Sequence, residues 1–104
     1  MSEKFVIGTD ITVQLTLQGV DVSGATTLKI GYIKANGSET SAEYVTATLT
    51  DTGTDSTIEG TIPHADNDTL GMLRVFPWVV QGDGKIVSTP AVEVEIISVG
   101  AKGE

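Results

Sequence analysis

The residues best suited to chemistry lie in one stretch of the chain, IPHADNDTLGMLRVFPWVV, at positions 62–80. It contains the chain's only histidine, His64, with Asp66 and Asp68 following at spacings of two residues. An imidazole beside two carboxylates could bind a metal ion or transfer a proton. The alternative is a polar corner between two β-strands, with the aromatic residues further along the stretch serving another purpose.

The number of ligands argues against a metal centre in this stretch. Zinc sites usually take three or four His, Cys or carboxylate ligands, and the chain has one His and no Cys. HADNDTLG superficially resembles a calcium loop, but it lacks the downstream glutamate that completes an EF-hand loop. Asp and Asn side chains in turns ordinarily bond nearby backbone N–H groups. The sequence therefore predicts a polar corner, with no metal ion and no cofactor.

Other catalytic arrangements find no better support. The chain has no G-x-S-x-G nucleophile elbow, and nothing marks any two of its carboxylates as a catalytic pair. The glycines in NGS and GDG are typical of turns, with no helix after them to present a phosphate site. We therefore expect no catalytic residues, no small-molecule substrate and no enzymatic activity.

Charge and composition narrow the range of partners. Six basic and fourteen acidic residues give a net charge of −8, without a Lys/Arg cluster for nucleic acid or an anionic membrane surface. The absence of Cys excludes disulfides. The apolar run near the start is shorter than a signal peptide needs, and no stretch approaches the roughly 18 apolar residues of a membrane helix. The sequence thus predicts a soluble protein made in a cytoplasm.

The elements that would position any site are short β-strands. Thr, Val and Ile supply 36 of the 104 residues, and ITVQLTLQ alternates apolar and polar residues with the period of a half-buried strand. Asn36-Gly37 predicts a short hairpin, and QGDG at 81–84 predicts a second turn. Similar alternation follows in TTLKIGYIK, AEYVTATLTD, STIEGTIP, GMLRVFPWVV and KIVSTPAVEVEIISV.

About seven such strands without a helical window predict an all-β fold, an antiparallel two-sheet sandwich of immunoglobulin-like type. An open barrel is the competing architecture. We expect one domain over residues 1–104, with its core at about 5–99 and short tails.

The strand GMLRVFPWVV has two possible core faces. One consists of Leu73, Val75, Pro77 and Val79. The other carries Arg74, Phe76 and Trp78, and burying it would also bury an unpaired guanidinium. The first face is therefore expected to point inward, which leaves Arg74, Phe76 and Trp78 outside as a partner-binding surface. Because Pro77 has no N–H, the strand should be an edge there or carry a bulge.

The succession of these segments resembles the small immunoglobulin-like structural (accessory or decoration) proteins of tailed bacteriophages and prophages. The matching pieces are Gly8-Thr9, SGAT at 23–26, KANGS at 34–38, DNDTLGMLR at 66–74 and the strand after Pro90. Ala35 departs from the pattern, which frequently has proline there. The likeness covers about residues 5–99 and implies a virion component with no catalytic residues.

The resemblance implies a capsid decoration or accessory head protein that binds a symmetric lattice in many copies, located in the virion and made in the host cytoplasm. Its partners would be viral capsid or tail proteins, or further copies of itself. A tail or baseplate protein, or a module that recognises a host-surface glycan or receptor, is the alternative. A cytoplasmic enzyme-associated module is a third. The single Trp favours a structural role over a glycan site.

Overall fold

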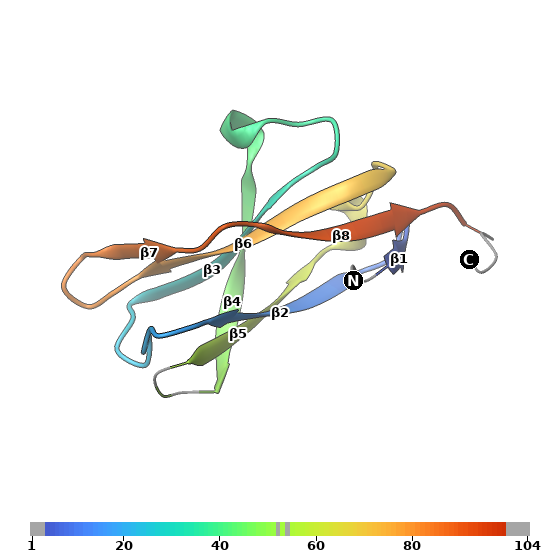
Figure 1. Cartoon of the computed structure of the whole chain (residues 1–104). Coiled ribbons are helices and arrows are strands. Elements are labelled where there is room, and N and C mark those ends of the chain that lie inside the picture. The colour runs from blue at the N-terminus through green and yellow to red at the C-terminus, as the bar shows by residue number, and fades with distance from the viewer. Residues whose placement is uncertain (1–3, 52, 54, 100–104) are drawn as a thin grey trace.

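The computed structural model describes residues 4–51, 53 and 55–99. Its elements follow one another along the chain as β1 (Lys4–Val6), β2 (Ile11–Leu17), β3 (Thr27–Ile33), η1 (Glu39–Ser41), β4 (Glu43–Asp51), β5 (Ser56–Ile62), η2 (His64–Asp66), β6 (Gly71–Val80), β7 (Ile86–Ser88) and β8 (Val92–Ile97). η1 and η2 are single 3₁₀ turns, and all other elements are strands (Figure 1). In the described part of the chain, no helix has the length and apolar character to cross a membrane.

The strands form two packed sheets that share β4. The large sheet has the order β1-β8-β6-β3-β4, with β7 pairing beside β6, and the small sheet has the order β4-β5-β2. Residues 43–46 of β4 pair with β3, and its later residues pair with β5 (Figure 1). All neighbouring strands are antiparallel except β1 and β8. The predicted all-β immunoglobulin-like sandwich is therefore confirmed.

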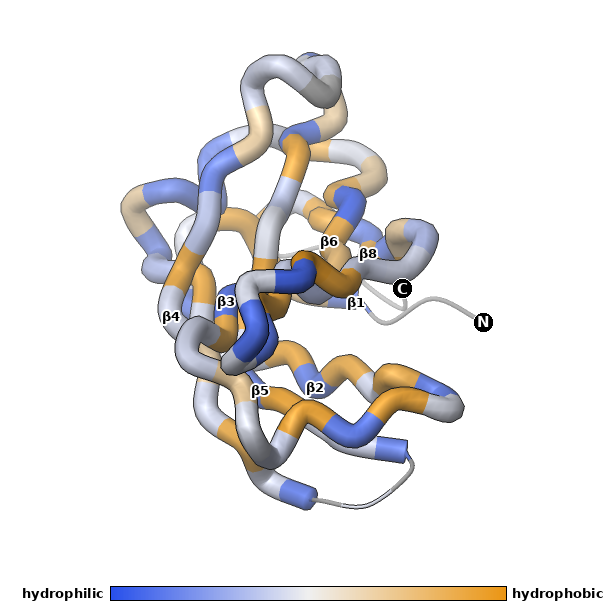
Figure 2. Tube along the Cα trace, turned by 90° about the vertical axis from the view of Figure 1, so that its left-hand side faces the viewer, coloured by the Kyte–Doolittle hydropathy of each residue, from blue (hydrophilic) through white to orange (hydrophobic). Residues whose placement is uncertain are grey.

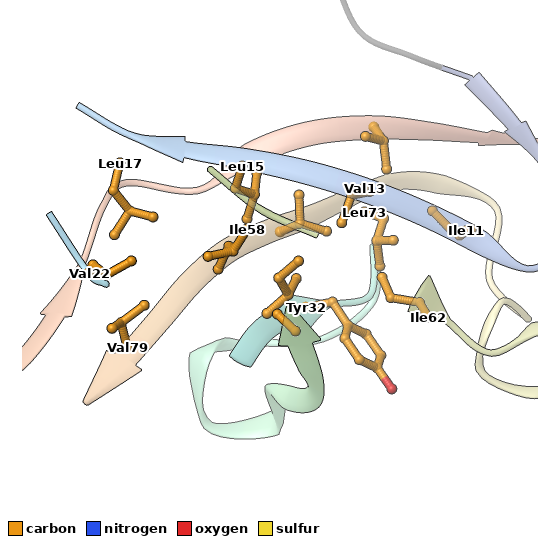
Figure 3. Close-up of a cluster of buried hydrophobic side chains, with 14 of the residues drawn as sticks. Ile11, Val13, Leu15, Leu17, Val22, Tyr32, Ile58, Ile62, Leu73 and Val79 are labelled. Atoms are coloured by element: carbon orange, nitrogen blue, oxygen red, sulfur yellow. The ribbon is translucent and has the colours of Figure 1, made fainter. Parts of the chain in front are cut away.

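One hydrophobic cluster fills the space between the sheets. In β2 the odd-numbered residues are buried and the even-numbered ones exposed, as period-two alternation requires when one face is solvated. Figure 3 shows side chains from β2, β3, β5 and β6 converging on this layer. Its most enclosed members include Ile11, Leu17, Ile30, Tyr32, Ile58, Ile62, Val75 and Val79.

The buried face predicted for β6 is confirmed. Leu73, Val75, Pro77 and Val79 are all buried, and the residues between them lie on the opposite face. The residues of that face are half-buried, in a strand that has neighbours on both sides in the large sheet. The cost of burying the Arg74 guanidinium thus decides which face of β6 points inward.

β6 is a central strand of the large sheet, but among the described residues it has a strand partner at Pro77 on one side only, so the predicted local edge is confirmed. Ser88 Oγ donates a hydrogen bond to Pro77 O at 2.6 Å, so this carbonyl points toward β7 and β8. The N and the C=O of a strand residue point to the same side, so the missing N–H faces that side too. There the neighbouring strand is interrupted between Ser88 and Val92, and no ladder bond is lost.

The short hairpin predicted at Asn36-Gly37 does not form, so that prediction is wrong. β3 ends at Ile33 and β4 begins at Glu43, with η1 between them, and neither residue of the pair has a left-handed φ. Ser41 Oγ accepts the Ser38 N–H at 2.9 Å and donates to Ser38 O at 2.7 Å. These local side-chain bonds hold a 3₁₀ turn that competes with the tight hairpin.

Candidate interaction surface

Three aromatic side chains gather on the outer face of the large sheet. Tyr44 comes from β4, and Phe76 and Trp78 come from β6, two strands away. The ring of Tyr44 lies edge-on to Phe76, at 5.9 Å between centroids and 89°, and equally near Trp78, at 5.9 Å and 61°. Edge-to-face pairs of this geometry contribute about 0.5–1.5 kcal/mol each beyond their buried area. We call Tyr44, Phe76 and Trp78 the aromatic cluster.

The cluster forms because the strand between β4 and β6 contributes a glycine. Gly31 of β3 is the register partner of Tyr44 on one side and of Phe76 on the other. A β-carbon built on Gly31 would overlap the ring of Phe76, so that ring lies directly on the glycine backbone. The space that a side chain on β3 would fill is thus occupied by Phe76, which brings it within reach of Tyr44.

A groove of about 360 Å³ runs beside the aromatic cluster. Its other walls are Ile33, Ala42, Arg74 and the segment Thr89-Pro90-Ala91, where the chain passes from β7 to β8. Arg74 lines the groove and donates a hydrogen bond from Nη2 to Gly37 O at 3.3 Å. The lining is largely apolar and includes no carboxylate.

The structure brings Arg74, Phe76 and Trp78 together on one outer surface, as strand alternation predicts. Sequence reasoning missed Tyr44, which is 43% exposed and completes the cluster. Its alternation with Thr46 and Thr48 could have placed it on the outer face. Nothing local, however, reports that β4 lies two strands from β6 in the sheet.

The corner containing His64, Asp66 and Asp68 is polar, as predicted, but its side chains bond to distant segments. Asp10 Oδ1 accepts a hydrogen bond from the backbone N–H of His64 at 2.7 Å. The same oxygen lies 3.0 Å from Nδ1 of the His64 ring. Asp68 pairs with Lys34 Nζ at 3.0 Å. Among the residues that the structure describes, no three His, Cys, Asp or Glu side chains form a group that could hold a metal ion.

These contacts lower the pKa of two exposed carboxyl groups. The side-chain hydrogen bond from His64 is the main cause of the lowered pKa of Asp10, and the bond from Lys34 is the main cause for Asp68. Both carboxylates therefore stay ionised at neutral pH.

Asp66 instead accepts a hydrogen bond from the hydroxyl of Tyr32 at 2.6 Å. Tyr32 is a core residue of β3, and Figure 3 shows its hydroxyl at the border of the hydrophobic cluster. Burial, followed by the bond to Asp66, raises the pKa of Tyr32 well above its ordinary value of 10.0. The phenol is therefore a structural donor that keeps its proton.

This raised pKa predicts a loss of stability at alkaline pH. Above about pH 10 the unfolded chain releases the phenolic proton while the folded chain keeps it, so the unfolded state binds fewer protons. The free energy of unfolding should then fall by up to about 1.4 kcal/mol per pH unit, from pH 10 up to the folded pKa. Urea unfolding between about pH 9 and 11.5 should show this slope in the wild type and a shallower one in Tyr32→Phe. Equal slopes would contradict the assignment.

Comparisons with known proteins support the fold alone. No family model matches the chain, and no curated protein matches it. A solved structure of the fibronectin(III)-like modules of Clostridium thermocellum CbhA is similar, with a TM-score of 0.51 and 19% identity over 96% of this chain and 89% of that one. The chain therefore has a fibronectin type III-like fold, a variety of the immunoglobulin-like sandwich.

Proposed function

We propose that this chain is a structural protein of a tailed-phage virion, a capsid decoration or accessory head protein that binds a symmetric lattice through its aromatic cluster. The proposal rests on one observation, the gathering of Tyr44, Phe76 and Trp78 with Arg74 around an apolar groove. The virion location comes from the resemblance of the sequence segments.

The chemistry of this surface suits a protein partner. Trp, Tyr and Arg are the residue types enriched at binding hot spots, where rings fill pockets from which water is excluded. The rings are already packed on Gly31 and on one another, so little side-chain entropy would be lost when a partner covers them. Arg74 in the groove lining could bond to carbonyl or carboxylate groups of the partner.

A glycan-recognition module is less well supported by the groove. Sugar recognition places carboxylates and amides around the stacking ring so that they bond to hydroxyl groups. The groove lining contains no Asp, Glu, Asn or Gln. The protein-binding role is therefore preferred over recognition of a glycan, and it extends equally to a tail or baseplate position or to a protein receptor.

Mass spectrometry of purified phage particles whose genome encodes this chain tests the proposal. We expect the chain in the particle at a copy number matching a multiple of the lattice symmetry, and its loss from particles made with Trp78→Ala. Absence of the wild-type chain from purified particles, with abundant chain free in the lysate, would refute a virion role.

A further inference from the structure

The outer edge of β2 is an open strand edge. Among the described residues its one strand partner is β5, in an unbroken register from Ile11↔Ile62 to Leu17↔Ser56. Every second residue of β2 therefore directs its N–H and C=O away from β5. Proteins usually protect such an edge with a charge, a proline, a bulge or a very short strand. ITVQLTL has seven residues and none of these devices.

The sequence of β2 is close to a palindrome about Gln14. Antiparallel pairing with itself about this residue would place Thr12 opposite Thr16, Val13 opposite Leu15 and Ile11 opposite Leu17. Every pair would then join polar to polar on the outer face or apolar to apolar on the core face. Such self-complementarity is what a two-fold interface between identical chains requires.

We propose that β2 pairs antiparallel with the β2 of a second copy, about a two-fold axis at Gln14, and joins the two small sheets into one. This interface is separate from the aromatic cluster and does not depend on the proposed function. Figure 2 shows β2 beside β5, apart from the strands of the large sheet.

The threonine pairs of the small sheet support this register. Thr12 Oγ1 lies 3.0 Å from Thr61 Oγ1, and Thr16 Oγ1 lies 2.9 Å from Thr57 Oγ1, so each outer threonine of β2 already has a hydroxyl partner on β5. With Thr12 opposite Thr16 of the second copy, each of these two threonine pairs would be extended by the threonines of the other β2 across the two-fold axis. Cross-strand Thr–Thr pairs are favourable in sheets.

The charge distribution permits the contact despite the net charge of −8. β2 carries no charge, and the acidic residue beside it on β5 is Glu59, opposite Gln14. Across the axis the two copies of Glu59 would be three strand spacings apart, about 14 Å. That exceeds the screening length of about 8 Å at physiological salt.

A groove beside β2, lined by both polar and apolar side chains with Glu59 and Glu93 among them, would be covered by the second copy. It has a volume of about 480 Å³ and runs between residues 12–15 of β2 and residues 92–94 of β8. Val92 on its far wall is 50% exposed, and Val13 and Leu15 form its near wall. A strand added to β2 would extend over this opening.

Sedimentation equilibrium of the full chain tests the pairing. The chain of 10.8 kDa should approach twice this mass as its concentration rises from about 1 µM to about 1 mM, the range of weak interfaces. Gln14→Lys places two like charges face to face on the axis, each beside a Glu59 that offsets part of the repulsion, and should raise the dissociation constant several-fold. Thr48→Lys, on the outer face of β4, and the neutral Gln14→Thr are matched controls and should dimerise normally.

Mixing two variants identifies the axis. Gln14→Glu alone should also weaken dimerisation, and an equimolar mixture with Gln14→Lys should restore it, because opposite charges then face each other. A wild-type chain that stays monomeric to about 1 mM would overturn the proposal. A dimer insensitive to Gln14→Lys, a mixture without rescue, or an edge that binds only an extended peptide of another protein would do so as well. Circular dichroism confirms that each variant is folded.

Discussion

Asn67→Ala is expected to lower the free energy of unfolding by about 2–3 kcal/mol, since two backbone carbonyls lose the donor that they share. Asn67 follows η2, is 4% exposed, and donates from Nδ2 to Val6 O and to Thr9 O, each at 2.9 Å. The backbone carbonyl of Asn67 accepts a hydrogen bond from the Gly8 N–H at 2.9 Å. These three bonds fasten the segment between β1 and β2 to the corner. Asn67→Ala removes the two that Nδ2 donates, and urea unfolding measures the effect of their loss.

Two further variants separate hydrogen bonding from simple packing. Asn67→Asp keeps the shape but sets a carboxylate oxygen against the two carbonyls, so its loss should be at least as large as that of Asn67→Ala. Asp68→Ala, at the exposed neighbouring position, should have a far smaller effect. If Asn67→Asp unfolded like the wild type, the account based on the donated bonds would be wrong.

If the proposed function is correct, Trp78→Ala is expected to weaken binding to the proposed virion lattice by about 2 kcal/mol or more, roughly a thirtyfold rise in the dissociation constant. The cost to folding should be smaller, about 1–2 kcal/mol, because the ring is half-buried and packs against Tyr44. The sequence alone suggested about 1 kcal/mol or less, as for a surface residue. A thermal melt and a particle-binding assay on the same variant measure both quantities.

Gly31→Ala and Leu70→Ala sharpen this experiment. A methyl group on Gly31 displaces the ring of Phe76, so binding should weaken although no side chain of the cluster has been removed. Leu70 is an exposed apolar residue that does not line the groove, and its replacement should leave binding unchanged. A loss of 3–5 kcal/mol in folding stability for Trp78→Ala, the cost of a core residue, would show that the ring supports the fold and not an interface.

Local patterns were sufficient for much of the fold. The alternation in ITVQLTL indicates both the strand and its buried face, and the guanidinium of Arg74 decides between the two faces of β6. The turn at QGDG also forms, with the Gly84 N–H bonded to Gln81 O at 2.9 Å. In each case the residues that decide the outcome are neighbours in the sequence.

The features that sequence reasoning missed depend on segments far apart in the chain. Asn67 looks like a turn residue, and its burial follows from the passage of residues 6–9 over it. Strand β1, with three residues, carries too little pattern to be recognised without β8 beside it. The last segment is divided into β7 and β8 where it passes Pro77 of β6, and nothing within the segment itself reports that neighbour.

The parallel pairing of β1 with β8 determines how the fold would respond to mechanical force. Lys4, Phe5 and Val6 pair with Glu95, Ile96 and Ile97, and both strands run in the same direction. Tension between the segment before β1 and the segment after β8 would pull these strands in opposite directions along their length. The backbone hydrogen bonds between β1 and β8 would be loaded together in shear and would not open one after another. The small ladder between the two ends of the described chain would therefore bear the load before the core does.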